Sequence, residues 1–448
     1  KMKQDLTKGN VTKALLLFAL PMILGNLLQQ CYNIADTWVV GRYVGADALA
    51  AVGSAYTLMT FLNSVLIGLC MGSGAIFSYY YGREDKQKLL ACTRTAFVMI
   101  GGVALGISIL VQLLTDPVLK LLRTPESLYA MTKSYVMIVF GGIFFVFLYN
   151  YFAFLLRAVG NSVVPLCFLG IASVLNIGLD LYFVIELQWS LQGAAIATVL
   201  SQVFSGVGLG IYTWWKEPQF RFSLKDFWQG EKPVGEICQY SMMTCAQQSV
   251  MNFGILMVQS LVNSFGAAVM AAFAAAVKID TFAYMPAQEF GNAYSIFISQ
   301  NFGAGQRERI KEGTRKAFCV SAVFCSVIAC LVVLFARYLM LIFVEPGETE
   351  IIAIGVQYLH IEGTFYVGIG ILFLLYGYFR GVNRPGVSLL LTVVSLGTRV
   401  LLAYVLSAIP AVGVTGIWWS IPIGWVLADG MGIALKNKKK KNGGNEHE

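Results

Sequence analysis

The chain has 448 residues, of which 57% are hydrophobic and only 12% are charged, and its mean hydropathy is +0.69. Soluble domains carry roughly 25% charged residues, so this composition excludes an ordinary soluble enzyme or binding domain. The formal net charge of +8 does not indicate nucleic-acid binding, because the basic residues lie in loops between apolar segments. The composition therefore predicts an all-α, polytopic membrane protein.

Twelve apolar segments are each long enough to cross a bilayer core of about 30 Å at about 1.5 Å per residue. The first is too long for a cleavable signal peptide, and no small-residue cleavage site interrupts it. Most lysines and arginines fall in loops on the side of the N-terminus, so the positive-inside rule predicts a plasma or inner membrane protein with both termini cytoplasmic. The expected spans are residues 14–40, 48–81, 89–114, 131–156, 163–185, 190–215, 234–263, 268–301, 314–343, 351–379, 387–408 and 413–435.

The sequence contains two copies of one six-span unit. Residues 82–97, G-R-E-D-K-Q-K-L-L-A-C-T-R-T-A-F, align with residues 303–318, G-A-G-Q-R-E-R-I-K-E-G-T-R-K-A-F, at an offset of 221. Farther along the offset becomes 223, which places Tyr135 over Tyr358. Six is an even number of spans, so both copies enter from the same side, which predicts a parallel 6+6 repeat with a pseudo-two-fold axis along the membrane normal. The expected parts are an N-terminal lobe (1–215), a cytoplasmic linker (216–236), a C-terminal lobe (237–435) and a basic cytoplasmic tail (436–448).

Ionisable residues inside membrane spans are costly and are therefore candidates for function. Counting at about 1.5 Å per residue places Asp36 and Asp180 in the outer half of the first lobe, with no lysine or arginine of that lobe at their depth. Asn176 shares a helix face with Asp180, and Thr198 lies at a similar depth. Carboxylate, amide and hydroxyl oxygens suit Na⁺, and adjacent buried carboxyls equally suit a proton. Taken alone, Asn176 and Thr198 are more simply explained by hydrogen bonds to neighbouring backbone carbonyls.

The second lobe carries charges of both signs near mid-depth, which are Lys278, Asp280, Glu362 and Arg399. They predict either an internal salt-bridge network or groups that contact the substrate or gate its passage. Glu289, which follows Pro286, and Gln248 are further candidates for the substrate path.

Other residue types narrow the function further. Pro21 lies about eight residues into the first span, where it removes a helix hydrogen bond and favours a kink. The nine cysteines lack C-x-x-C spacing, and His360 and His447 are the only histidines. The pattern predicts no cofactor and no catalytic cluster, so an enzyme is not expected. Two similar but unequal halves suit alternating access around a cleft better than a symmetric channel.

Several motifs together resemble the multidrug and toxic compound extrusion (MATE) family over essentially the whole chain. They are P-M-I-L, Y-N-I-A-D-T-W-V-V-G-R and G-A-D-A-L-A-A-V-G near the first span, R-A-V-G-N-S after the fourth and Q-N-F-G-A-G-Q after the eighth. The resemblance implies two six-helix lobes that form a V, and efflux of cationic or amphipathic compounds in exchange for Na⁺ or H⁺.

The first lobe is similar to the DinF-like branch of that family. In that branch the resemblance implies a cation site, and possible Na⁺ ligands, at Asp36, Asn176, Asp180 and Thr198, with Pro21 as the kinking proline. The NorM-like branch instead places acidic residues in spans 7 and 10. Here span 7 has glutamines, and Glu362 in span 10 does not match that branch's spacing.

The sequence thus predicts a monomeric secondary multidrug antiporter whose partners are the lipid bilayer and small-molecule drugs or toxic compounds, not nucleic acid. The alternative is a lipid-linked precursor flippase of the same superfamily. Such flippases usually carry more spans and a strongly cationic cavity, whereas here only Lys278 and Arg399 lie deep. The transported compound and the choice between Na⁺ and H⁺ stay open.

Overall fold

The computed structural model describes residues 2–442, so His447 and the end of the expected basic tail (436–448) lie outside it. Every element in this range is a helix or helical turn, and the range contains no strand. The chain forms two compact units. Unit 1 comprises the residues up to Leu6 together with Leu20–Cys245, and unit 2 comprises Thr7–Ala19 together with the residues from Ala246 onward.

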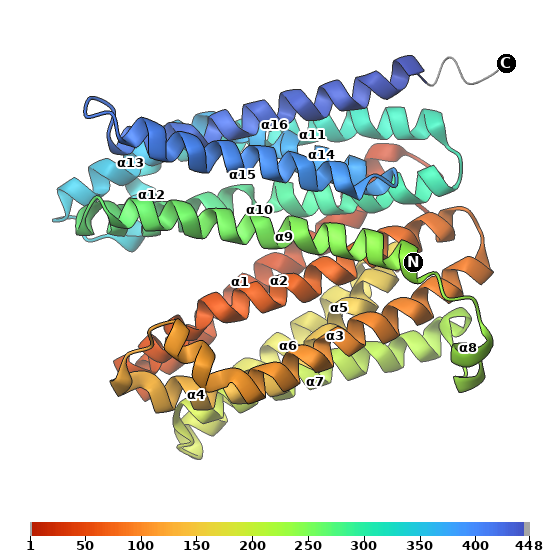
Figure 1. Cartoon of the computed structure of the whole chain (residues 1–448), viewed down its shortest axis with the longest axis horizontal. Helices are drawn as coiled ribbons and strands as arrows, with labels where there is room; N and C mark the ends of the chain where they lie inside the picture. The colour runs from red at the N-terminus through yellow and green to blue at the C-terminus, as the bar shows by residue number, and fades with distance from the viewer. Residues whose placement is uncertain (1, 443–448) are drawn as a thin grey trace. The chain divides into compact units, whose positions relative to one another are not determined.

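The helices of both units can be followed by colour in Figure 1. Up to the end of the expected linker they are α1 (Val11–Val39), η1 (Val40–Val44), α2 (Ala46–Gly82), α3 (Lys86–Leu121), α4 (Glu126–Gly141), α5 (Ile143–Ala158), α6 (Val163–Leu181), η2 (Tyr182–Glu186), α7 (Ser190–Lys216), η3 (Pro218–Phe220) and α8 (Leu224–Gln229). They continue with α9 (Val234–Asn263), α10 (Ala267–Gly303), α11 (Arg307–Leu334), α12 (Ala336–Phe343), α13 (Thr349–Thr364), α14 (Tyr366–Gly381), α15 (Pro385–Ser407) and α16 (Val414–Asn442).

Nine of the described helices are long and apolar enough to cross a membrane, and the number is eleven if each of two bent helix pairs is one span. The pairs are α4 with α5, bent by 41°, and α13 with α14, bent by 53°. The seventh predicted span corresponds to α9, which is 30 residues long but interrupted by polar residues. The chain is therefore a multi-pass, all-helical membrane protein, as the sequence predicts.

The internal repeat is visible in the backbone at the places where helices break. Leu114 inside α3 and Phe335 between α11 and α12 have φ angles of −108° and −105°. They are separated by the same offset of 221 residues that aligns the two sequence copies. Gly142 and Phe365, at the bends of the two helix pairs, are separated by the offset of 223. Equivalent positions therefore adopt the same irregular backbone in both copies.

Polar side chains of α3 donate to carbonyl groups in the last turn of α4, next to its bend with α5. Ser108 Oγ donates to the Phe140 carbonyl at 2.9 Å, and Gln112 Nε2 donates to the Met137 carbonyl at 2.6 Å. A free carbonyl in the hydrocarbon region costs several kcal/mol, so a broken span needs such donors. These polar residues of α3 therefore support the bend.

The start of α9 packs closely on α2 within unit 1 through the glycines of G-L-C-M-G (68–72). A Cβ atom on Gly72 would lie only 2.4 Å from the Tyr240 carbonyl oxygen, and one on Gly68 would also meet the backbone of α9. Ser241 Oγ donates to the Leu69 carbonyl of α2 at 3.0 Å. Helix–helix contacts in membranes are typically rich in small residues, which let the two backbones approach closely. We call this contact the α2–α9 seam.

Two helices, α1 and α9, contribute to both units. The division falls between Ala19 and Leu20 in α1, directly before Pro21, and between Cys245 and Ala246 in α9. α1 is helical through Pro21, although the missing proline N–H leaves one backbone hydrogen bond unmade. Because α1 and α9 are the first helices of the two sequence copies, each copy starts with a helix that is shared.

Candidate functional site

The two aspartates predicted for the first lobe lie on helices that run side by side in unit 1. A Cβ atom on Gly25 of α1 would lie 3.7 Å from the side chain of Leu166 on α6. Farther along, a Cβ atom on Gly170 of α6 would lie 3.6 Å from the side chain of Leu28 on α1. The two helices therefore run in the same direction in close contact. Extending this register toward their ends brings Asp36 to the level of Asp180.

The carboxyl groups of Asp36 and Asp180 lie within hydrogen-bonding reach of each other. Asp180 is fully buried. No donor among the described groups reaches either oxygen of Asp180 or Oδ1 of Asp36. Two ionised carboxylates in contact would repel each other strongly in a medium of low dielectric constant. A shared proton, or one cation bound between the carboxyls, removes this repulsion, so the pair can take up either.

Asn176 and Thr198 are the neutral groups predicted for the same site. Asn176 is buried one helical turn before Asp180, and its Oδ1 has no donor in the described part of the chain. Thr198 is on α7, which packs along α6, but its hydroxyl donates to the Ala194 carbonyl at 3.0 Å. None of the contacts described for residues 2–442 joins Thr198 to either aspartate. The Asn176 amide oxygen is thus free to bind a cation. The Thr198 hydroxyl already donates its hydrogen to a backbone carbonyl, so only its oxygen could still bind a cation.

Two tyrosines beside the acid pair are absent from the predicted site. Tyr32 of α1 and Tyr135 of α4 both lie within electrostatic range of Asp36 and Asp180. Tyr32 precedes Asp36 by four residues, so helical spacing could have identified it. Tyr135 comes from a different span, and sequence spacing alone gives no reason to place it there.

Each acid-bearing helix ends in a π-helical turn. In η1 the Gly45 N–H donates to the Val40 carbonyl at 3.1 Å, and after η2 the Leu187 N–H donates to the Tyr182 carbonyl at 3.1 Å. These bonds span five residues instead of four, and η1 and η2 lie against each other. Single π-helical turns are frequent at functional sites because they reposition neighbouring side chains. The sequence does not predict them.

In unit 2, Asp280 is held by two tyrosine hydroxyls. Tyr358 Oη of α13 donates to Oδ2 of Asp280 at 3.0 Å, and Tyr366 Oη of α14 donates to Oδ1. Asp280 lies on α10 and is 4% exposed. The hydroxyl donors stabilise this carboxyl group inside the protein, in contrast to Asp180 of unit 1.

Glu362 and Arg399 lie near Asp280, but Lys278 does not. Glu362 is fully buried, and neither of its oxygens has a donor in the described chain. Asp280 and Arg399 are both within its electrostatic range, while Nε of Arg399 has no hydrogen-bond partner among the described groups. Lys278 is exposed, with its ammonium group 5.7 Å from the centre of the Phe343 ring. The four charges therefore do not form one ion-pair network.

The remaining candidates, Glu289 and Gln248, lie elsewhere on their helices. Glu289 is in electrostatic contact with buried Arg380 of α14. The Arg380 guanidinium also donates to Asn292 Oδ1 and Ser295 Oγ, at 3.2 Å each. Gln248 is half-buried on α9. Arg380 is thus a buried charge that the predicted site omits, and the polar residues spaced along one face of α10 are the signal that could have found it.

Replacing Tyr366 with Phe is expected to destabilise the protein by about 1–3 kcal/mol, because Oδ1 of buried Asp280 would lose its donor. Thermal melting in detergent measures this effect. Tyr338→Phe, which changes an exposed tyrosine of the same unit, is the matched control and should melt like the wild type. Equal melting temperatures for the two variants would contradict a supporting role for the Tyr366 hydroxyl.

Comparison with known proteins finds sequence relatives over nearly the full length. A family model described as MatE matches residues 21–182 and 241–405, one stretch in each sequence copy. The chain is 32% identical over 391 residues to "Probable multidrug resistance protein YpnP" of Bacillus subtilis (strain 168), which covers 87% of each chain. It is 26% identical over 440 residues to "Probable multidrug resistance protein YoeA" of the same organism, covering 95% of this chain and 93% of the relative.

Solved structures share the fold. One described as "Outward-facing conformation of a multidrug resistance MATE family transporter of the MOP superfamily" matches with a TM-score of 0.90 at 22% identity, over 97% of each chain. At this identity the match establishes the arrangement of the helices only.

Proposed function

Since this chain belongs to the MATE family of multidrug efflux transporters, we propose that it is a secondary antiporter. It exports cationic or amphipathic small molecules in exchange for Na⁺ or H⁺ by alternating access, and it is not an enzyme. The relatives are named as multidrug resistance proteins, and the substrate class is carried over from that family.

The observation that carries this proposal is the carboxyl pair of Asp36 and Asp180, which lacks donors among the described groups. An exchanger needs a site whose free energy falls considerably when it binds a cation, but which can also release that cation. Repulsion between the two carboxylates makes cation binding favourable, because this repulsion is relieved only when a cation or proton is present. A ligand shifts a conformational equilibrium by as much as its affinity for the two states differs. A small change in the separation of these two carboxyls would make that difference large.

α1 is the element that we propose transmits ion binding. It carries Asp36 near its outer end, and its first turns, up to Ala19, group with unit 2. Pro21 follows this division directly, where the helix lacks one backbone hydrogen bond and bends at low cost. Neutralisation of Asp36 by the ion would draw the outer part of α1 toward α6 and bend the helix at Pro21.

Both coupling ions fit the residues present. A proton needs only the two carboxyls, which then share it in a hydrogen bond. Na⁺ would take the oxygens of Asp36 and Asp180, the free Asn176 Oδ1 and a lone pair of the Thr198 hydroxyl. Within residues 2–442 no group of three or more His, Cys, Asp or Glu side chains is arranged to hold a metal ion, so Na⁺ would depend on the two neutral ligands.

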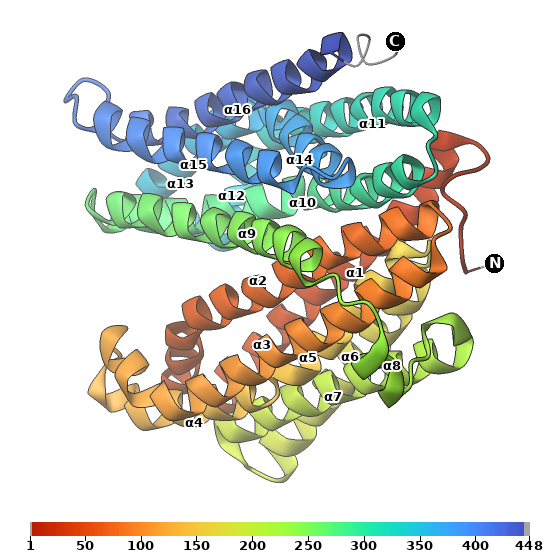
Figure 2. The ribbon, with the colours of Figure 1, turned by 45° about the vertical axis from the view of Figure 1, so that its right-hand side comes forward.

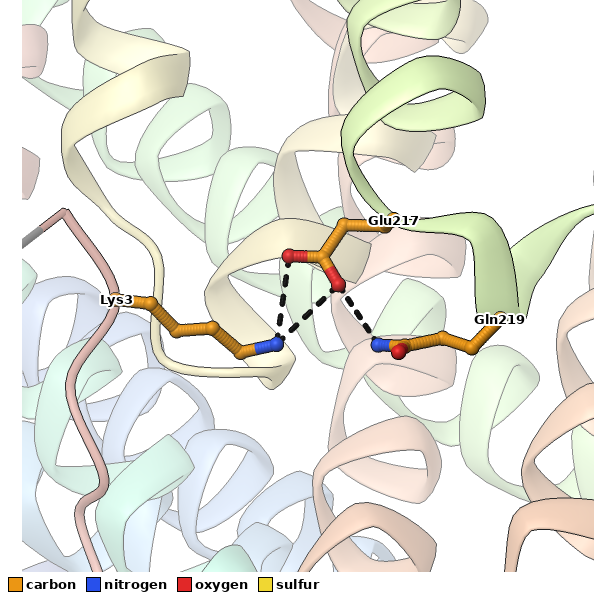
Figure 3. Close-up of polar contacts among 3 residues, drawn as sticks. All are labelled: Lys3, Glu217 and Gln219. Carbon is orange, nitrogen blue, oxygen red and sulfur yellow. Dashed lines mark hydrogen bonds and ion pairs between the residues drawn. The ribbon is translucent and has the colours of Figure 1, made fainter.

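We further propose that the chain acts as a monomer in the plasma membrane with both termini in the cytoplasm. The contact in Figure 3 supports the placing of the N-terminus and the 216–236 linker at one end of unit 1. Lys3 Nζ donates to both carboxylate oxygens of Glu217, at 3.3 and 3.2 Å, and Gln219 Nε2 donates to the same group at 2.7 Å. Six spans between these two segments require that they lie on the same side.

Transport in vesicles tests the proposal and identifies the ion. The purified chain would be reconstituted into lipid vesicles, and uptake of ethidium, a cationic amphipathic probe, would be followed under an imposed Na⁺ gradient and, separately, an imposed H⁺ gradient. We expect ethidium exchange driven by at least one gradient and abolished when an ionophore collapses it. No exchange under either gradient would contradict the proposal and would favour the flippase alternative.

A further inference from the structure

The segment 214–232 between the last span of unit 1 and α9 exposes large apolar side chains, although most of it lies outside any span. We call it the interfacial segment. In α8 the exposed fractions are 81% for Leu224 and 83% for Trp228, and at the end of α7 they are 53% for Trp214 and 70% for Trp215. Leu224 and Trp228 are four residues apart and so share one face of α8. Exposure of this apolar surface to water would be unfavourable, so we expect another molecule to bury it.

The rest of the interfacial segment is anchored to unit 1 by phenylalanines, so the exposed face cannot fold inward. Phe220 is buried. The rings of Phe227 and Phe222 meet edge to face with their centroids 4.9 Å apart, and Phe222 lies 6.1 Å from Phe97 of α3. Figure 2 shows α8 at the end of unit 1 where α7 ends. One side of α8 therefore faces the protein, and the side with Leu224 and Trp228 faces outward.

The acidic residues of the segment are all engaged by partners within unit 1. Glu217 accepts from Lys3 and Gln219 (Figure 3). Asp226 accepts from the Ser223 backbone N–H at 2.8 Å and from the Ser223 hydroxyl at 3.1 Å, and these bonds lower the pKa of Asp226. Glu231 pairs with Lys88 at 3.1 Å.

The basic residues of the segment, in contrast, pair with no carboxylate among residues 2–442. They are Lys216, Arg221, Lys225 and Lys232. Lys216 Nζ lies 4.9 Å from the centre of the Trp215 ring, and the Arg221 guanidinium lies 6.0 Å from that of Trp214. The exposed surface of the interfacial segment thus combines basic side chains that pair with no carboxylate with exposed indole and leucine side chains.

This combination has one fitting occupant, and we propose that the interfacial segment binds anionic phospholipids in the membrane leaflet at the N-terminal end of unit 1. The phosphate groups would pair with the lysines and Arg221, while Leu224 and Trp228 enter the boundary between headgroups and acyl chains. Tryptophan favours this boundary because its ring is apolar and its N–H is polar. Basic residues near the membrane surface add attraction for anionic lipids specifically. The segment would thereby fix this end of unit 1 at the boundary between the membrane and water.

Fluorescence quenching in vesicles tests this inference. The full chain would be reconstituted into brominated phosphatidylcholine alone or mixed with brominated phosphatidylglycerol. Because the chain has eight tryptophans, the Trp228 signal is taken as the difference between wild type and Trp228→Tyr. We expect this signal to be quenched at least twofold more strongly with phosphatidylglycerol present, and to be poorly quenched by aqueous acrylamide.

A matched pair of charge variants tests the electrostatic part. Lys225→Gln with Lys232→Gln should remove the preference for phosphatidylglycerol. Lys120→Gln with Arg123→Gln, at the opposite end of α3, should leave it unchanged.

Strong acrylamide quenching would overturn the proposal by showing that the face meets water. Resistance to both quenchers would overturn it in favour of a protein partner or a second copy. Equal quenching by both lipids would overturn the preference for anionic headgroups.

Discussion

Asp180→Asn is expected to abolish ion-coupled drug efflux while leaving the folded protein intact. Asp180 is fully buried against Asp36 with no donor among the described groups. An asparagine amide would donate to Asp36 permanently and remove the repulsion that attracts the coupling ion. The site would then imitate its loaded state whether or not an ion is present. Drug resistance of cells that express the variant should fall to the level of cells without the transporter.

The melting temperature separates loss of coupling from loss of folding in this experiment. It should stay at or above that of the wild type, because the variant removes a carboxyl group that lacks donors. Asp47→Asn is the control, since Asp47 is an exposed aspartate in the first turn of α2, close behind η1. It should retain wild-type efflux. Full efflux by Asp180→Asn at normal protein levels would rule out the coupling role of the acid pair.

Gly72→Ala is expected to destabilise the protein by about 1–3 kcal/mol, the usual cost of overpacking. The added Cβ would lie 2.4 Å from the Tyr240 carbonyl oxygen and 2.8 Å from Ser241 Cα. Both are backbone atoms of α9 and cannot rotate away, so the α2–α9 seam must open. A lower melting temperature in detergent and a smaller yield of folded protein would measure the effect, and Gly72→Leu should prevent folding.

Gly53→Ala on the same helix provides the matched control. A Cβ atom at Gly53 meets nothing within 4 Å, so alanine there should be neutral or stabilise the helix by up to about 1 kcal/mol. If both variants melt alike, close contact of α2 with α9 is not needed for stability. The seam matters because α9 passes from unit 1 to unit 2 just after it, at Cys245.

The two units use equivalent positions of the repeat for different chemistry. Tyr135 and Tyr358 align in the sequence, and each lies beside a buried acid of its own unit. Asn176 and Arg399 also align, but one brings a neutral amide and the other a positive charge. The scaffold is therefore shared, while the acids are placed independently. This asymmetry supports assigning coupling to unit 1 and leaves the Asp280 cluster stabilised by hydroxyl donors.

Much of the fold could be predicted from the sequence because the membrane imposes a simple rule. Apolar length along a helix predicts spans, and only helices satisfy every backbone group within one segment. The repeat could be read from a constant offset, and the all-helical class and the family were predicted correctly on these grounds. The predicted spans 4 and 10 nevertheless appear as bent pairs, because a bend depends on donors such as Ser108 from a neighbouring helix.

The candidate site was only partly predictable, for a physical reason. Depth along a helix follows from residue number, so the sequence could place Asp36 and Asp180 at a similar height. The direction of a side chain around the helix axis depends on which neighbour the helix packs against. Lys278 and Asp280 are only two residues apart but point in different directions. Lys278 lies over the Phe343 ring, whereas Asp280 accepts a hydrogen bond from Tyr358.

The sequence by itself determined the membrane class, the repeat and the position of each charged residue along its helix, because these depend on composition and on the constant rise of a helix. Only the tertiary structure decided that Asp36 meets Asp180, since their contact requires the close packing of α1 on α6 at Gly25 and Gly170. It also decided that Tyr135 joins them, that both helices end in π-helical turns, and that α1 and α9 are shared between units. These features arise from packing between segments far apart in the chain, which no local pattern encodes.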